Sequence, residues 1–321
     1  MNQTQNPPVL KLSLQSTKEH GSTISYQVFG QPLRTAPIVL VNHALTGNSN
    51  LAGQNGWWKE LVGVGKVIDL TVYTVIGLNI PGNAYPDKTN VITSDYKTFT
   101  TRGIAELFWQ ALDGLCITHL YAVIGGSLGG AIAWEMAVLR PKAISHLIPI
   151  ATSLQASDWL IGNVLVQETL LSQSVKPVEN ARMHAMLLYR TPESLTQKFN
   201  KTYVDSENQY AVESWLQYHG STLHSRYPLP AYKQMNYLLR TIGEGLTEEV
   251  ITEFALESTS YIHCIAIDSD YMFTIKEQKE TYKKIKKFKQ HIDFHEIKSI
   301  HGHDAFLIEF DQLNSLLNNI F

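Results

Sequence analysis

The stretch Leu120-Tyr-Ala-Val-Ile-Gly-Gly-Ser127-Leu-Gly-Gly-Ala-Ile-Ala-Trp-Glu135 decides the fold of this chain. A short apolar run predicts a strand, and a helix-favouring run follows directly after the pattern G-x-S-x-G. This order is typical of a tight strand-to-helix turn that exposes a serine, whose strained backbone requires small neighbours such as Gly125 and Gly129. We therefore interpret Ser127 as a nucleophile, in preference to part of a simple Gly/Ser turn.

Apolar runs alternate with helical segments around this turn, which predicts an α/β fold with a mostly parallel central sheet and helices on both faces. The first two strands are expected to pair antiparallel around a polar turn that includes Gly21. Strands are expected at 9–14, 23–29, 38–41, 73–78, 120–124, 146–150, 261–267 and 293–297, and helices at 104–115, 128–139, 276–288 and from about 305 to the C-terminus.

The segment 153–240 shows no buried-strand pattern, and its aromatic and aliphatic residues recur at helical spacing. Pro192, Pro228 and Pro230 interrupt it. We predict a helical cap over 153–240, inserted into an α/β core formed by 1–152 and 241–321.

A serine hydroxyl needs a base and an orienting acid, and two later segments offer them. In proteins of the α/β-hydrolase type the acid follows a late strand and the histidine follows the last strand. Asp268 and Asp270 end the predicted strand 261–267, whereas His301 and His303 follow the predicted strand 293–297. Order and spacing favour a Ser-His-Asp triad. They leave open the choice between Asp268 and Asp270 and the choice between His301 and His303.

Two backbone amides are candidates for the oxyanion hole, which stabilises negative charge on the substrate oxygen. One belongs to Leu128, directly after the serine, and the other to the loop 42–47 after the buried strand 38–41. We take Leu45 as the second donor.

Composition narrows the class of protein further. The 321 residues are 44% hydrophobic and 17% charged, with a net charge of −3, which is ordinary for a globular enzyme and gives no reason to expect nucleic acid as a partner. The N-terminus lacks a secretory signal pattern and no apolar run is long enough to span a membrane, so no membrane association is expected. Cys116 and Cys264 are interpreted as buried, reduced thiols, which suits a cytoplasmic protein.

Beyond these motifs, the chain resembles the homoserine O-acetyltransferase family of the α/β-hydrolase superfamily. The resemblance implies an α/β-hydrolase fold and acetyl transfer from acetyl-CoA, a co-substrate rather than a bound cofactor, to L-homoserine in methionine biosynthesis. The segments that carry it are HALTG at 43–47, GWWKELVGVGKVID at 56–69, FTTRGIAE at 99–106, GGSLGGAIAWEMAVLRP at 125–141, IPIATS at 148–153, ARMHAMLLYRTPESL at 181–195, VESWLQYHG at 212–220, DSDYMF at 268–273 and GHDAFLIE at 302–309.

The resemblance also implies roles for particular residues. The aspartate of the DSDYMF segment that matches the family's acid is Asp270, and the histidine of GHDAF that matches its base is His303. Arg182 would meet the carboxylate of the acceptor amino acid, Tyr189 would lie in the same pocket, and Asp304 would hold the ammonium group. A homodimer through the cap helices is expected on the same ground.

Several alternatives stay open. A serine esterase or thioesterase uses the same triad with water as the acceptor, and a related transferase could use succinyl-CoA or L-serine. The loop 79–86 departs from the family pattern and the cap is shorter between 153 and 182, so donor and acceptor choice is not fixed by the sequence. A non-catalytic binding protein of the same fold is disfavoured because the triad is complete.

One further pattern, His291-Ile-Asp293-Phe-His295, puts three potential metal ligands on one face of a predicted strand. We favour a solvated edge strand and predict no metal, because the chemistry described above needs none.

Overall fold

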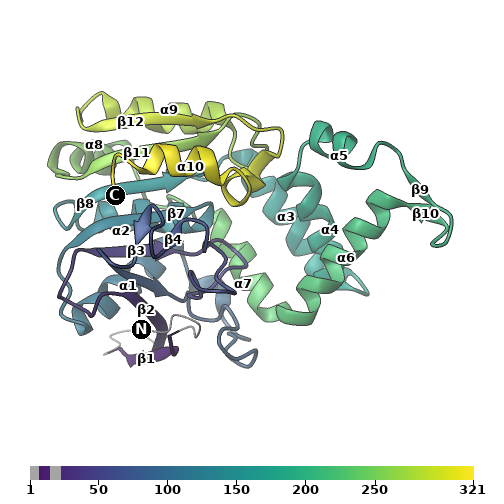
Figure 1. Ribbon diagram of the computed structural model, residues 1–321, viewed down its shortest axis with the longest axis horizontal. Helices are drawn as coiled ribbons and strands as arrows, with labels where there is room; N and C mark the ends of the chain where they lie inside the picture. The colour runs from purple at the N-terminus through teal and green to yellow at the C-terminus, as the bar shows by residue number, and fades with distance from the viewer. Residues whose placement is uncertain (1–6, 15–22) are drawn as a thin grey trace.

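A sheet of eight strands forms the centre of the molecule, in the order β1-β2-β6-β3-β7-β8-β11-β12 (Figure 1). The computed structural model describes residues 7–14 and 23–321, and the predicted turn around Gly21 lies outside these residues. Pairing is antiparallel between β1, β2 and β6 and parallel from β6 to β12, which confirms the mostly parallel sheet. The strands are β1 (Leu10–Ser13), β2 (Thr23–Gly30), β3 (Ile38–Asn42), β6 (Thr74–Leu78), β7 (Leu120–Gly126), β8 (Ile144–Ile150), β11 (Tyr261–Ile267) and β12 (Ile292–Ile297).

Side chains of the central strands divide between two apolar layers, one on each face of the sheet. Alternation along a strand explains the division: Leu40 belongs to one buried cluster, whereas Val39 and Val41 belong to the other. Both layers are covered by helices, as the apolar runs of the sequence predict. The first is covered by α1 (Thr101–Gly114), α2 (Leu128–Leu139), α8 (Glu248–Glu257) and α9 (Ile275–Lys286), and the second by α10 (Phe310–Leu317).

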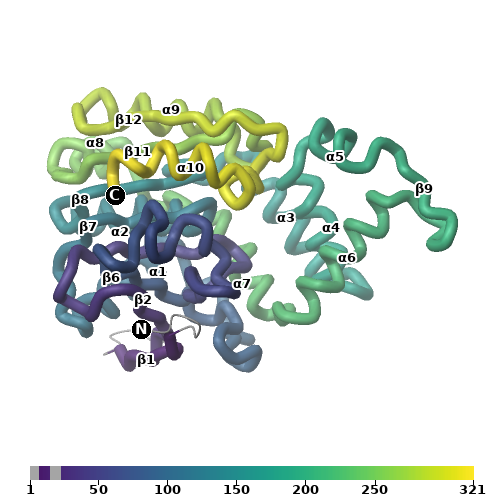
Figure 2. Tube along the Cα trace, in the orientation of Figure 1, coloured from purple at the N-terminus to yellow at the C-terminus, as the bar shows by residue number. Residues whose placement is uncertain are grey.

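A helical region is inserted between β8 and β11 and projects to one side of the core (Figures 1 and 2). Proline stands in the first turn of three of its helices, where its missing amide costs nothing, so these prolines begin helices rather than merely ending them. The division at 152/153 and 240/241 stays a prediction. The helices are α3 (Asp158–Gln173), α4 (Pro177–Tyr189), α5 (Pro192–Phe199), α6 (Ala211–Arg226) and α7 (Leu229–Arg240).

The structure differs from the sequence-based expectations in small elements. Helix α8 and the two-residue strands β4 (Val62–Gly63), β5 (Ile68–Asp69), β9 (Tyr203–Val204) and β10 (Gln209–Tyr210) were not predicted. The final helix begins as a 3-10 segment, η2 (Gly302–Leu307), before α10; a second such segment is η1 (Tyr96–Thr98).

The prediction of two buried thiols is wrong for Cys116, which is exposed, while Cys264 is buried. Cys116 has a φ of 57° in the turn that ends α1, and this turn directs its side chain outward between Leu115 and the buried Ile117. Among the described helices, none combines the length and apolar character needed to cross a membrane.

Candidate active site

Ser127 occupies the sharp turn between β7 and α2. Its backbone has φ 57° and ψ −125°, a conformation that costs energy in a non-glycine residue and is held here by the surrounding structure. Its amide donates to the carbonyl of Ile150 at 2.8 Å. A Cβ on Gly129 would stand 2.3 Å from the carbonyl oxygen of Asn42, and one on Gly125 would stand 2.5 Å from Gly129. Strand and helix can therefore approach closely enough to form the turn only because both positions are glycine.

The structure brings Ser127, His303 and Asp270 together at the carboxyl ends of the strands. The Ser127 hydroxyl lies 2.9 Å from Nε2 of His303, and Nδ1 of His303 lies 2.7 Å from a carboxylate oxygen of Asp270. The other Asp270 oxygen accepts hydrogen bonds from the amides of Met272 and Phe273. All three side chains are buried, so the contacts are shielded from water.

The remaining candidates, Asp268 and His301, lie outside this chain of contacts. Asp268 accepts a hydrogen bond from the amide of Ser299 and lies near Lys298, so it fixes the loop that follows β12. Nδ1 of His301 faces Ser194 and Arg190 in the cap.

The amides of Leu45 and Leu128 belong to the loop after β3 and to the start of α2, the helix that directly follows the serine. Within the described residues, neither amide donates a hydrogen bond to the protein. Both residues are buried, so these N–H groups are candidates for a ligand oxygen.

The loop that carries Leu45 is fastened by side chains that the sequence did not single out. His43 Nδ1 bonds the carbonyl of Ala44 at 2.8 Å, and its Nε2 accepts from the amide of Ile80 at 3.1 Å, which requires the neutral ring. Burial lowers the pKa of His43 to about 4, in keeping with this assignment. From the cap, the Tyr227 hydroxyl donates to the carbonyl of Leu45.

The unusual loop 79–86 supports the same structure. Asn83 contacts Nε2 of His43 at 3.2 Å and also donates to the side chain of Asn79. Asn79 in turn bonds Ser25 and Ser49 beneath the loop. No motif marks these residues in the sequence, because their function is to hold backbone and not to react.

Arg182, Tyr189 and Asp304 gather beside the triad. The Arg182 guanidinium lies 5.5 Å from the centre of the Tyr189 ring, and that ring lies 5.6 Å from the His303 ring. Burial of its carboxyl group raises the pKa of Asp304, and the charge of Arg182 opposes the rise. Burial likewise raises the pKa of Tyr189. The group thus combines a cation with a half-buried carboxyl group near His303.

A small pocket between cap and core shares Tyr189 with this group. Leu45 and Met272 line it from the core, and Leu160, Tyr189 and Tyr232 from α3, α4 and α7. Its lining is mostly apolar.

Fold and site together define an α/β-hydrolase-fold enzyme, and a family model described as alpha/beta hydrolase fold matches residues 37–309. Similar curated proteins include the homoserine O-acetyltransferase of Moorella thermoacetica, 31% identical over 95% of this chain and 92% of that protein. The homoserine O-acetyltransferase of Salinibacter ruber is 30% identical over 99% of this chain and 97% of that protein. The chain therefore belongs to the homoserine O-acetyltransferase family.

Solved structures share the fold at lower identity. Homoserine O-acetyltransferase from Bacillus anthracis superposes with a TM-score of 0.84 at 18% identity, covering 98% of both chains. The esterase E22 superposes with a TM-score of 0.83 at 16% identity, also over 98% of both chains. Transferases and esterases thus share this scaffold, so the fold alone does not fix the acceptor.

Proposed function

We propose that this enzyme transfers an acetyl group from acetyl-CoA to the hydroxyl of L-homoserine through an acyl-enzyme on Ser127. His303 takes the serine proton as the hydroxyl attacks the thioester, then gives that proton to the departing CoA sulfur. The homoserine hydroxyl enters, loses its proton to His303 and attacks the acyl group, and Ser127 leaves with the proton from His303. Asp270 holds the imidazole in the required tautomer.

Negative charge develops on the carbonyl oxygen in both steps. The amides of Leu45 and Leu128 are the proposed donors to this oxygen, and one such donor typically lowers the barrier by roughly 3 kcal/mol. Because His43, Tyr227 and Asn83 hold the loop in place, the donors need little rearrangement when the substrate binds.

The observation that carries the proposal is the placement of Arg182 and Asp304 near His303. An α-amino acid presents a carboxylate and an ammonium group at fixed separation, and one cation with one anion matches both. Within the described residues Arg182 makes no ion pair, so its guanidinium is available to a ligand carboxylate. A simple esterase substrate would leave both groups without a partner.

The deciding experiment compares acetyl-CoA with succinyl-CoA, each with L-homoserine, L-serine or no acceptor. We expect O-acetyl-L-homoserine by mass spectrometry, with parallel lines in the two-substrate kinetic plot that mark a ping-pong mechanism. A preference for succinyl-CoA or L-serine would move the assignment to the related transferase.

A serine esterase or thioesterase is the second candidate, favoured by the full-length structural similarity to esterase E22. A hydrolase of this kind should release CoA from acetyl-CoA at a rate that does not depend on the concentration of L-homoserine. If an activated ester fails to label Ser127, both the transferase and the hydrolase assignments are contradicted, and a non-catalytic binding protein is favoured.

We further propose a homodimer assembled through the cap. Helices α3 and α4 expose an apolar patch made of Trp159, Leu165, Val166 and Leu187, of which Leu165 is 67% exposed. Exposed apolar side chains grouped in this way are typical of an interaction surface.

A further inference from the structure

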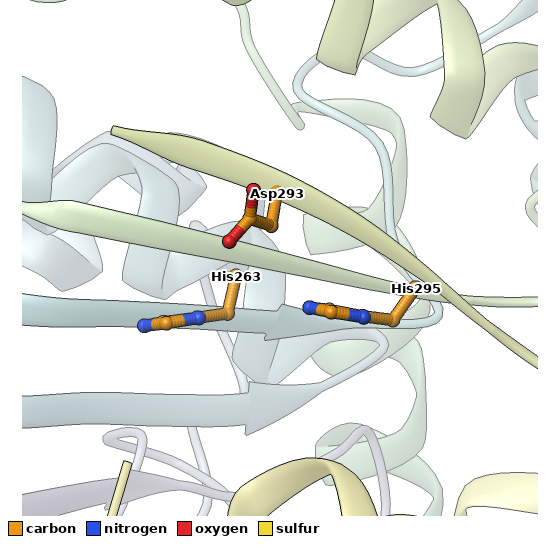
Figure 3. A group of neighbouring side chains, drawn as sticks. All are labelled: His263, Asp293 and His295. Atoms are coloured by element: carbon orange, nitrogen blue, oxygen red, sulfur yellow. The ribbon is translucent and has the colours of Figure 1, made fainter. Parts of the chain in front are cut away.

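A cluster of imidazole and carboxylate side chains lies on the sheet, away from the proposed active site. His263 on β11 pairs in register with Asp293 on β12, and His295 follows two residues later on the same face. One ligand atom from each of the three side chains lies within 4.8 Å of the other two. Figure 3 shows the His295 ring directed along the sheet toward His263, with the Asp293 carboxylate beside them.

The position of the cluster separates it from catalysis. His263 stands four residues before the end of β11, which corresponds to about 13 Å along an extended strand, while Asp270 follows that end. The cluster is therefore near the amino ends of the strands, and the serine, histidine and aspartate are at the carboxyl ends.

The hydrogen bonds around the cluster leave one ligand atom of His263 and one of Asp293 available to a metal ion. Nε2 of His263 lies 3.1 Å from Nδ1 of His146 on β8, and a His263 that donates there keeps the lone pair of its own Nδ1. The Tyr261 hydroxyl donates to Oδ2 of Asp293 at 2.8 Å, which leaves the other oxygen for a ligand. Metal ligands in proteins are characteristically oriented by such outer hydrogen bonds.

The charges around the cluster also suit a cation. Asp293 makes no ion pair with a lysine or arginine in residues 7–14 and 23–321, so its carboxylate is available to an entering ion.

We propose that His263, Asp293 and His295 form a binding site for a zinc ion, with solvent completing its coordination. Zinc favours nitrogen ligands together with carboxylate oxygen, whereas magnesium and calcium favour all-oxygen sites. Ligand atoms around tetrahedral zinc are about 3.4 Å apart, as follows from bond lengths near 2.0–2.1 Å. Binding would therefore require side-chain rotations that bring these atoms closer together than the 4.8 Å within which they now lie. A bound ion would link the edge strand β12 to β11 and stabilise the sheet.

The test uses the full chain without a histidine tag, because a tag would itself bind zinc. The protein is stripped with EDTA, equilibrated with zinc and measured by mass spectrometry of its metal content, and cobalt provides an absorption spectrum that reports nitrogen and oxygen ligands. We expect about one equivalent of zinc in the wild type. Zinc at a hundredfold excess over its dissociation constant should raise the midpoint of thermal unfolding by about 5 °C.

Asp293→Asn and His295→Gln should each abolish the bound equivalent and the thermal shift. His291→Gln is the matched control, because His291 is adjacent in sequence but lies outside the ligand group. His146→Phe should weaken zinc binding about 10- to 100-fold, since it removes only the partner that orients His263.

Circular dichroism and labelling of Ser127 by an activated ester show that each variant is folded. Absence of stoichiometric zinc in the wild type would overturn the proposal, as would an equivalent that persists in both Asp293→Asn and His295→Gln. Neither outcome bears on acetyl transfer.

Discussion

Two aspartates lie two residues apart after β11, and their contacts give them different predicted roles. Asp270→Asn should lower kcat by about 10⁴-fold, because an amide at this position favours the wrong tautomer of His303. Asp268→Asn is the control, since the Asp268 carboxylate contacts Ser299 and Lys298 in the loop after β12, and it should reduce activity far less. Steady-state kinetics with acetyl-CoA and homoserine measure both. Equal losses in the two variants would contradict the assignment.

The substitution Arg182→Ala should affect the transfer of the acetyl group to L-homoserine but not the acetylation of Ser127. Loss of a charge-assisted contact to the acceptor carboxylate should lower kcat/KM for L-homoserine roughly 10- to 100-fold, equivalent to about 1.5–3 kcal/mol. The rate of acetylation of Ser127 by acetyl-CoA should change little, and rapid-quench measurement of the acyl-enzyme tests this.

Arg240→Ala offers the comparison, because Arg240 also packs on a cap tyrosine but belongs to the end of α7. It should leave both half-reactions intact. Slower acetylation in Arg182→Ala would show that Arg182 serves the donor.

Individual residues also show which assignments could not be made from chain order alone. Chain order narrowed the acid to Asp268 or Asp270, because both follow the same strand, and the family resemblance chose Asp270. The structure places Asp270 against His303. The sequence-based interpretation of His291, Asp293 and His295 as a solvated edge strand did not include His263. The structure groups His263 with Asp293 and His295 through the register between β11 and β12, whereas His291 precedes β12 and lies outside this group.

At the scale of elements, close packing of α2 against β3 depends on Gly129. Gly129→Ala should destabilise the protein by about 3 kcal/mol, because its Cβ would stand 2.3 Å from a backbone oxygen that cannot move aside. The helix propensity of alanine, about 1 kcal/mol better than glycine, is too small to compensate. Gly162→Ala in α3, where a Cβ meets nothing within 4 Å, should instead stabilise slightly. Urea denaturation compares the two, and equal effects would refute the packing argument.

Helix α2 also carries a buried acid, Glu135, which pairs with Arg102 of α1 at 3.3 Å. Burial raises the pKa of Glu135 to about 7, and Arg102 only partly opposes it. The protonated form is therefore favoured by folding, so this contribution to stability is complete below the ordinary carboxyl pKa and is lost as the pH rises through about 7.

Glu135→Gln removes this titration. The free energy of unfolding of the wild type, relative to that of the variant, should fall by about 3 kcal/mol between mildly acidic and mildly alkaline pH. Urea denaturation at both pH values measures it, with exposed Glu253→Gln as control. If the difference in free energy of unfolding between the wild type and Glu135→Gln is the same at both pH values, the expected ionisation of Glu135 is contradicted.

Long apolar elements were predictable and short or polar ones were not. Strand β11 and helix α2 have the predicted bounds, because each is a mostly apolar segment ended by a clear signal. Helix α8 was missed although Thr247 caps it, and the strands β9 and β10 are two residues each, too short for any periodicity. Helix α8 packs against α2 and α9, so tertiary contacts help to stabilise it. Strands β9 and β10 pair with each other, and their side chains Tyr203 and Tyr210 are exposed.

At the scale of the whole molecule, the proposed dimer depends on the apolar patch of α3 and α4. Leu165→Glu should convert a dimer into a monomer, because the charge would have to be desolvated in the interface. Light scattering coupled to size exclusion measures the mass. Leu256→Glu, at a similarly exposed site on α8, should leave the assembly unchanged. A wild type that is monomeric at every concentration would exclude this use of the patch.

The uncharged His43 beneath the loop that carries Leu45 has a consequence for how acid affects the protein. Because burial lowers the pKa of His43 to about 4, mild acidification does not protonate its ring, and the hydrogen bonds that hold the loop persist. A decline of rate in weakly acidic buffer would therefore have a cause other than the loss of this support.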